Sequence, residues 1–369
     1  MKKSIAFKIG AGLGAAVLLT GLLVVTGVLP SPAELLSRKG PPQADMVVDK
    51  TLRDEVLDGV IANLNSYYVF PDQAKQIEMA LRNKLTSGGY DAITSAEDLA
   101  ATLTADIHQV NNDRHIDVAY SEAVLTDAEF EESEDEALTA EQVAELKRLN
   151  YGVHAASRLP GNIGYLDIQS FPPAEAAAPK YAAAMSLLSD TKALIIDLRA
   201  NQGGQPEAVA LLASYLFDER THLNDIYLRD GNQTIEMWTQ DTLAGPRYGA
   251  QRKVYLLTSV DTFSAGEDFA YALKNLKRAT LIGKATGGGA HPGSPRRINE
   301  HFAMIVPSGR SISPITQTDW EGTGVLPDIE MDPEDALVQA QILILKDQLT
   351  TEKDPRVHRL LEARLDDLE

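Results

Sequence analysis

The amino-terminal part of the chain carries apolar residues at helical spacing. In three consecutive segments they recur every three or four positions, the pattern of one buried helix face. The third segment follows Thr94 and Ser95, residue types that commonly begin a helix. We therefore predict a helical subdomain at 45–120. The apolar positions are Leu52, Val56, Val60, Ile61 and Leu64, then Ile77, Ala80, Leu81 and Leu85, then Leu99, Leu103 and Ile107.

The pattern changes after Gly161, where short uninterrupted apolar runs alternate with helical stretches. Such runs, bounded by Gly, Pro or Asp, are typical of buried strands. Strands that alternate with helices predict an α/β core, which we place at 151–332. The predicted strands are 163–168, 193–198, 254–259 and 280–283, and the predicted helices are 174–188, 206–217 and 265–276.

The first thirty residues resemble a membrane signal. Lys2, Lys3 and Lys8 precede the uncharged apolar stretch 9–29, which as a helix is long enough to cross a bilayer core of about 30 Å. We predict a signal peptide or a signal-anchor at 1–30. The basic start places the rest of the chain outside the inner membrane, in the periplasm or cell envelope, anchored or secreted.

The remaining segments have the composition of connections. Residues 31–44 contain prolines and small polar residues and are predicted to be a linker. Residues 121–150 hold ten acidic and two basic residues, so we predict an acidic linker that becomes helical towards its end. Its charge, directly after His115, suggests two hypotheses: it raises the pKa of that histidine, or it favours basic peptides. Residues 333–369 are predicted to be a charged helical tail.

Composition narrows the chemistry. A length of 369 residues allows about two domains. The net charge of -19 argues against nucleic acid as a partner, because most of the surface repels phosphate. Cysteine is absent, which excludes disulfides, thiolate nucleophiles and Cys-ligated metals. Covalent catalysis would then use a hydroxyl, a lysine or a carboxylate.

Two predicted strand ends carry residues suited to acyl transfer. The segment Asp197-Leu-Arg-Ala-Asn-Gln-Gly203-Gly204 places two glycines where a helix begins, which frees backbone N–H groups for an oxyanion hole or an anion-binding turn. The segment Thr-Phe-Ser264-Ala-Gly-Glu267 places a serine at a helix amino terminus, where the dipole stabilises negative charge. The same serine and glutamate also form a capping box, so a structural interpretation stays open.

A histidine segment supplies a base. Histidine is the usual general base near neutral pH, although His115, which is followed by alternating apolar residues, is more often structural in such a setting. Metal ligation by Asp113, His115 and Asp117 is conceivable but unspecific, and we expect neither a metal nor a cofactor. The other histidines compete for the base role on composition alone; they are residues 108, 154, 222, 291, 301 and 358.

Two glycine-containing segments complete the set. Residues 284–292, with the sequence Lys-Ala-Thr-Gly-Gly-Gly-Ala-His-Pro, do not form a phosphate loop, because the lysine precedes the glycines and no helix pattern follows. We interpret them as a flexible loop that lines a cleft. Residues 320–328, with the sequence Trp-Glu-Gly-Thr-Gly-Val-Leu-Pro-Asp, indicate by themselves only a turn.

Taken together, these segments resemble the carboxy-terminal processing (tail-specific) serine peptidase family. The resemblance covers about 45–332 and is closest to the branch that includes interphotoreceptor retinoid-binding protein and the tricorn protease core. It implies a ClpP/crotonase-like core of ββα units with a helical amino-terminal subdomain. The matching segments are 67–71, 113–117, 150–152, 161–165, 197–204, Ser264 and 320–328.

The resemblance also implies roles for particular residues. Ser264 matches the nucleophile, His115 the general base, and Glu321 the acidic residue that completes the relay. The oxyanion hole would use the backbone N–H groups of Ala265 and of Gly203 or Gly204.

The chain departs from the family pattern at three points. Tail-specific enzymes use a lysine 25 residues after the serine, where this chain has Gly289, so a Ser–Lys dyad is excluded. Tricorn has a serine before the base, where this chain has Arg114. No segment has the pattern of a PDZ domain.

The sequence therefore predicts an exported serine peptidase that cleaves peptides or unfolded protein segments. The alternative is a non-catalytic protein that binds a hydrophobic, retinoid-like or lipid-like ligand in the same cleft. An acyl-CoA enzyme of the crotonase type is a third reading, which the membrane signal disfavours. The expected partners are a peptide or protein substrate and, through residues 1–30 only, a membrane.

Overall fold

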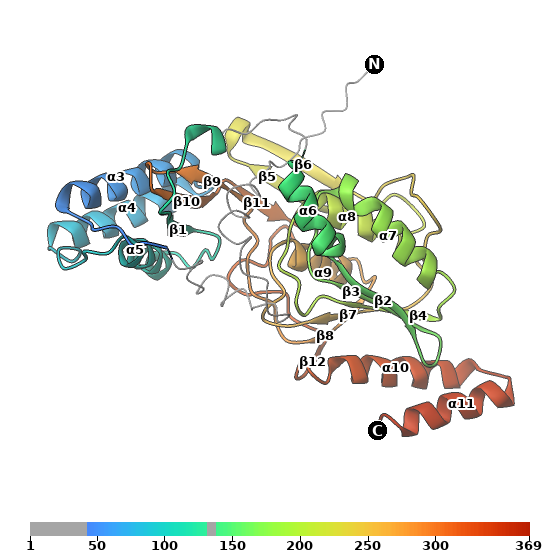
Figure 1. The fold of residues 1–369 in the computed structure, drawn as a ribbon. Helices are drawn as coiled ribbons and strands as arrows, with labels where there is room; N and C mark the ends of the chain where they lie inside the picture. Colours follow the sequence, from blue (N-terminus) through green and yellow to red (C-terminus); the bar gives the residue numbers. More distant parts are fainter. Residues whose placement is uncertain (1–42, 131–137) are drawn as a thin grey trace, which may run out of the picture. The chain divides into compact units, whose positions relative to one another are not determined.

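A computed structural model describes residues 43–130 and 138–369 of the chain (Figure 1). The predicted signal or anchor at 1–30 lies outside the described residues, as do most of the predicted linker at 31–44 and residues 131–137 of the acidic segment. Within the part of the chain that is described, no helix combines the length and the apolar character needed to cross a bilayer.

The chain divides into two compact units, and each is built from three separate stretches of sequence. The boundaries predicted from the sequence run continuously along the chain and stay predictions. Among the described residues, the first unit comprises 43–130, 138–142, Ile226–Ile235 and His291–Ser311, and the second comprises Val143–Asp225, Glu236–Ala290 and Ile312–Glu369.

The first unit begins with the three predicted helices. They are α3 (Lys50–Tyr67), α4 (Pro71–Thr86) and α5 (Ala96–Val110). Ser95 begins α5 as expected, because its side chain accepts a hydrogen bond from the N–H of Asp98 at 3.0 Å. The apolar faces of the three helices form one buried core, which confirms a helical amino-terminal region.

A small antiparallel sheet that the sequence analysis did not predict packs against these helices. Its strands are β1 (Asp117–Tyr120), β10 (Phe302–Pro307) and β9 (Gly293–Arg297), in the order β1-β10-β9. Val118 and Phe302 extend the helical core from the sheet. The pairing of β1 with β10 joins residues that are far apart in sequence, so it leaves no local signal.

The shorter elements connect the larger ones. Helix α6 (Ala140–Arg148) is the helix expected towards the end of the acidic segment. Short 3₁₀ turns lie at 127–129, 150–152 and 230–232. A separate sheet of order β11-β5-β6 consists of β11 (Gly309–Ile312), β5 (His222–Leu228) and β6 (Gln233–Trp238).

The second unit contains a six-stranded sheet of order β12-β8-β7-β4-β3-β2, in which only β2 is antiparallel to its neighbour. All four predicted strands are in this sheet, and the predicted helices are α7 (Ala174–Leu188), α8 (Pro206–Ser214) and α9 (Ala265–Asn275). The α/β prediction is therefore confirmed. The strands are β2 (Val153–Leu159), β3 (Ile163–Ile168), β4 (Ala193–Asp197), β7 (Val254–Thr258), β8 (Thr280–Gly283) and β12 (Ile329–Glu330).

Helices cover both faces of this sheet. Every residue of β4 and β7 is buried, which explains their uninterrupted apolar runs. Alternate residues point to opposite faces. One set, including Ile195 and Leu257, packs against α10 (Ala336–Thr351), whereas α7 and α8 lie on the other side (Figure 1).

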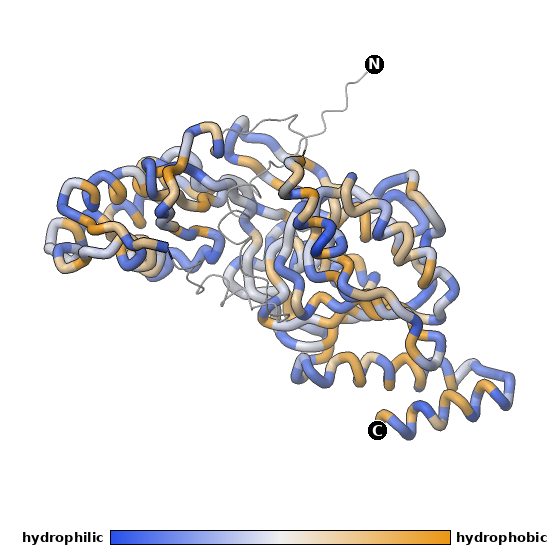
Figure 2. Tube along the Cα trace, viewed as in Figure 1, coloured by the Kyte–Doolittle hydropathy of each residue, from blue (hydrophilic) through white to orange (hydrophobic). Residues whose placement is uncertain are grey.

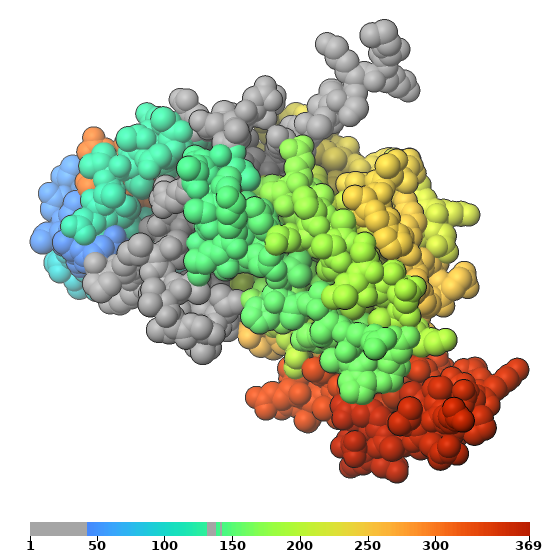
Figure 3. Space-filling model, turned by 45° about the vertical axis from the view of Figure 1, so that its right-hand side comes forward, coloured from blue at the N-terminus to red at the C-terminus, as the bar shows by residue number. Residues whose placement is uncertain are grey.

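The charged carboxy-terminal segment is helical, as predicted, and α10 belongs to the core of the second unit. Hydrophobic and hydrophilic residues alternate along α10 and α11 (Pro355–Asp366) (Figure 2). Gln348 donates a hydrogen bond to the carbonyl of Gly161 at 2.9 Å, at the β2–β3 turn. Figure 3 shows the same packing, with the red carboxy-terminal residues against the green segment.

Substituting Leu345 on α10 tests whether the packing of this helix contributes to the free energy of unfolding. Leu345 is fully buried among the strands, so Leu345→Ala should lower the free energy of unfolding by about 2–5 kcal/mol. Leu360 on α11 is 71% exposed, and Leu360→Ala should change it by less than about 0.5 kcal/mol. Urea unfolding of both variants measures the difference, and equal effects would contradict the role of α10.

Candidate active site

Ser264 occupies a strained turn between β7 and α9. It is the N-cap residue of α9, with φ 53° and ψ -118°, and its side chain is half-buried. A residue with a Cβ rarely adopts this positive φ, and such strain costs on the order of 1–3 kcal/mol. A sharp strand-to-helix turn projects the nucleophile from the sheet edge in α/β-hydrolases.

The glycine turn after β4 lies directly against this serine. Gly203 has φ 94°, and a Cβ added to it would lie 2.7 Å from the Cβ of Ser264 and 3.2 Å from the amide nitrogen of Ala265. The N–H of Phe263 also donates to the carbonyl of Asn201 at 2.9 Å. The two strand ends singled out in the sequence therefore meet, and the contact requires a glycine.

The backbone N–H groups of this turn are not equivalent. The N–H of Gly203 donates to the side-chain oxygen of Asn201 at 2.9 Å, so it is already engaged. Within the described residues, the N–H groups of Gly204 and Ala265 donate to no protein acceptor. Of the three predicted oxyanion donors, Gly204 and Ala265 are therefore the two whose N–H groups are available.

A buried carboxylate connects Ser264 to the glycine-rich loop 284–290. Glu267 is fully buried and accepts hydrogen bonds from Ser264 N–H at 2.9 Å, Thr286 Oγ1 at 2.5 Å, Gly288 N–H at 2.6 Å and Gly289 N–H at 2.8 Å. Burial raises its pKa to about 7, and the four hydrogen bonds oppose this rise. The sequence suggested only the capping contact with Ser264, since nothing local connects Glu267 to the loop.

The same loop holds Glu321. The N–H of Ala290 donates to Glu321 Oε2 at 2.6 Å. The indole N–H of the buried Trp320 donates to the carbonyl of Gly289 at 2.8 Å. The segment 320–328, which the sequence indicated only as a turn, is therefore hydrogen-bonded to the glycine-rich loop through Trp320 and Glu321.

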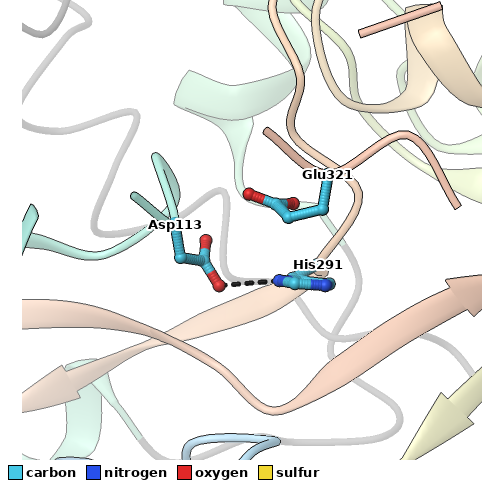
Figure 4. Close-up of side chains that lie close together, drawn as sticks. All are labelled: Asp113, His291 and Glu321. Atoms are coloured by element: carbon cyan, nitrogen blue, oxygen red, sulfur yellow. Dashed lines mark hydrogen bonds and ion pairs between the residues drawn. The ribbon is translucent and has the colours of Figure 1, made fainter. Parts of the chain in front are cut away.

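In the first unit, a buried aspartate organises the histidine segment. Asp113 is fully buried and accepts a hydrogen bond from the hydroxyl of Tyr68 at 3.0 Å and from the backbone N–H of His115 at 3.1 Å. Its Oδ2 lies 2.7 Å from Nδ1 of His291, the bond drawn in Figure 4. Nδ1 of His115 is 3.9 Å from Asp113 Oδ1. The hydrogen-bonded ring partner of Asp113 is therefore His291, which sequence reasoning did not distinguish from the other histidines.

Burial and the neighbouring charges determine the protonation state of His115. Burial lowers the pKa of His115 to about 4, and the charges of His291 and Arg114 add to this effect while Asp113 opposes it. His115 is therefore neutral near pH 7. Desolvation is the largest cause of this shift, and the hypothesis that the neighbouring acidic segment raises the pKa of His115 stays a prediction, because residues 131–137 lie outside the described residues.

The residues considered as metal ligands have other contacts. Asp117 accepts a hydrogen bond from Thr104 Oγ1 at 3.3 Å. Oδ2 of Asp113 is engaged by Nδ1 of His291 at 2.7 Å.

The predicted site residues therefore fall into two groups. The first unit holds His115. The second unit holds Ser264, Ala265, Gly203, Gly204 and Glu321.

Known proteins resemble the chain in sequence and in fold. A carboxyl-terminal-processing peptidase of Arabidopsis thaliana chloroplasts is 30% identical over 185 residues, which cover 46% of this chain and 33% of the relative. Among solved structures, a protein from Parabacteroides merdae has a TM-score of 0.58 at 18% identity and covers 82% of this chain and 99% of its own. A lipoprotein from Streptococcus agalactiae has a TM-score of 0.53 at 15% identity, covering 84% of this chain and 99% of its own. These two structures share the fold.

Two models of one family match consecutive parts of the chain. The model of peptidase family S41 matches residues 162–331, which contain Ser264 and Glu321. The model of the amino-terminal domain of this family, as found in eukaryotic interphotoreceptor retinoid-binding protein, matches residues 50–155, which contain His115. As its motifs predict, the chain belongs to peptidase family S41, a family of serine peptidases.

Proposed function

We propose that this protein is a serine peptidase that attacks peptide bonds with Ser264. The main observation that supports this proposal is the strained backbone of Ser264. Strain of this kind persists only where the surroundings impose it, and here Gly203 packs against the serine from one side while Glu267 binds its N–H from the other. A purely structural N-cap needs no positive φ, because N-cap residues ordinarily adopt extended backbone.

The oxyanion would be stabilised by the N–H groups of Ala265 and Gly204. Attack by Ser264 Oγ on a carbonyl carbon converts the carbonyl oxygen to an oxyanion, which needs donors that are already in place. Ala265 begins α9, so the helix dipole adds to the stabilisation.

His115 would serve as the general base. It takes the proton of Ser264 Oγ during attack and returns it to the leaving amine, so the acyl-enzyme forms as the amine departs. The family resemblance supports the assignment, and the lowered pKa of His115 keeps the ring in the neutral form that a base requires. Glu321 would complete the relay as the acidic residue.

The substrates would be peptides or unfolded protein segments outside the cytoplasm. The Arabidopsis relative is named for carboxyl-terminal processing, and the Streptococcus structure is that of a lipoprotein. The apolar stretch at 9–29 supports export. The parallel sheet of the second unit, with helices on both faces, is compatible with the ClpP/crotonase-like core that the resemblance implies.

Labelling of the full chain with a fluorophosphonate tests the nucleophile and the base. Ser264→Ala should abolish labelling, and His115→Ala should reduce it by about 100-fold or more, because proton transfer contributes about that factor. Lys284→Ala is the matched control and should label normally, since its ammonium pairs only with the exposed Glu330 in the described residues. Intact mass spectrometry measures the rate.

Three results would overturn parts of this proposal. Labelling of Ser264→Ala would exclude Ser264 as the nucleophile. Full labelling of His115→Ala together with loss in His291→Ala would move the base role to His291. If the wild type does not label and a retinoid quenches Trp238 fluorescence, the alternative of a hydrophobic-ligand-binding protein is favoured. That alternative rests on the match to the amino-terminal domain found in the retinoid-binding protein.

Gly203→Ala tests the packing behind the nucleophile. The new Cβ would lie 2.7 Å from the Cβ of Ser264, so the serine must move, and labelling should fall by about 100-fold. Gly249→Ala is the control, because Gly249 has a similar φ of 82° and its Cβ would meet only the side chain of Asp218. It should lose stability but keep the labelling rate; equal labelling of the two variants would contradict the prediction.

A further inference from the structure

The buried carboxylate of Glu267 has an unusual set of neighbours. Its two oxygens accept four hydrogen bonds, two each, from Ser264, Thr286, Gly288 and Gly289. Three of the donors are backbone N–H groups, which cannot accept a proton in return. None of the four groups titrates, so the protonation state of the carboxyl is the only variable in this contact.

The loop that Glu267 holds is also bonded to the segment around Glu321. Gly288 accepts from the N–H of Gly322 at 2.9 Å, Gly289 accepts from Trp320, and the N–H of Ala290 donates to Glu321. On its other side, the N–H of Gly287 donates to the carbonyl of Thr262, two residues before Ser264.

We propose that Glu267 is a positioning residue whose ionised carboxylate clamps the loop 286–290 to the backbone of Ser264 and thereby holds the nucleophile and Glu321 in place. The inference rests on the proposed peptidase function and adds a requirement to it. Glu267 acts through the backbone, since its carboxylate binds the N–H of Ser264.

Protonation would weaken this clamp. A neutral carboxyl carries an O–H on one oxygen, and that hydrogen would face a donor, so at least one of the four hydrogen bonds must break or the loop must move. The ionised form can accept all four. We therefore expect the nucleophile to be fully positioned only when Glu267 is ionised.

Activity and stability should then respond to pH in opposite directions. The pKa of Glu267 is about 7 in the folded protein, against an ordinary value of 4.5. Between these two values the folded state binds more protons than the unfolded state, so the contribution of Glu267 to the free energy of unfolding falls as the pH rises. Ionisation around the pKa of about 7 positions Ser264, so the labelling rate should rise about tenfold between pH 6 and 8.

The first test compares Glu267→Gln with Asp268→Asn in the full chain. A glutamine amide has one acceptor oxygen and would direct an NH₂ group at N–H donors, so labelling should fall by about 100-fold and lose its rise between pH 6 and 8. Asp268 is the matched control, because it is the next residue on α9, is also buried with a raised pKa, and binds Asn224 instead of the loop. Asp268→Asn should keep the pH profile of labelling even if it loses stability.

The second test keeps the carboxylate and removes one donor. The hydrogen bond from Thr286 lowers the pKa of Glu267, so Thr286→Val should move the midpoint of the labelling profile to higher pH. Thr258→Val is the control, because Thr258 is buried and donates to the carbonyl of Lys284 at 2.9 Å at the start of the same loop. It should leave the midpoint in place.

The outcomes separate this inference from the proposed function. If the wild type labels at Ser264 but Glu267→Gln labels at the same rate, or Thr286→Val leaves the midpoint unchanged, the positioning role is wrong and the peptidase proposal stands. If the wild type does not label or Ser264→Ala still labels, the peptidase proposal itself fails. Thermal unfolding of each variant shows whether it is folded. If Glu267→Gln does not fold, the labelling profile of Thr286→Val decides whether the positioning role holds.

Discussion

One buried group, the carboxyl of Glu267, joins the serine turn to the glycine-rich loop of the second unit, and its burial needs compensating hydrogen bonds from the protein. Four hydrogen bonds supply that compensation, and they come from the serine turn and from the glycine-rich loop. The glycines at 288 and 289 suit the role, since their small size lets the backbone itself approach the carboxylate. The positive φ of Ser264 persists in this setting because the groups on both sides of the serine are fixed.

The first unit also contains a buried carboxyl group, and other hydrogen bonds compensate for its burial. Asp113 is also fully buried, and its compensation comes from Tyr68, His291 and the backbone of His115. Burial opposes ionisation of Asp113, but the hydrogen bond and charge of His291, together with the charge and backbone N–H of His115, lower its pKa below the ordinary value. The pKa of His115, whose Nδ1 lies 3.9 Å from Oδ1 of Asp113, is instead lowered by desolvation. Asp113 thus contacts two histidine rings at different distances, 2.7 Å for His291 and 3.9 Å for His115.

Much of the fold could be predicted from local pattern. The strands at 163–168 and 280–283 and the helix at 174–188 have the predicted bounds, because their apolar runs end at Gly, Pro or polar residues that stop the element in any context. The strands at 117–120 and 302–307 were missed, because they are short and their pairing joins distant parts of the chain. The packing of α10 against the sheet was also missed, because residues 333–369 were interpreted as one charged tail, although Lys346 and Asp347 are the only charged residues of α10.

For the candidate site, the sequence by itself determined the residue types: a serine at a strand-to-helix junction, a double glycine, and a chain without cysteine, which left a hydroxyl as the natural nucleophile. These are local facts, since each depends on residues within a few positions of one another. Only the tertiary structure decided that Gly203 packs against Ser264, that His291 is the ring bonded to Asp113, and that Glu267 joins the serine turn to the loop. The physical reason is that hydrogen bonds between distant segments form where backbone and side chains meet in space, and the order of residues along the chain does not record those meetings.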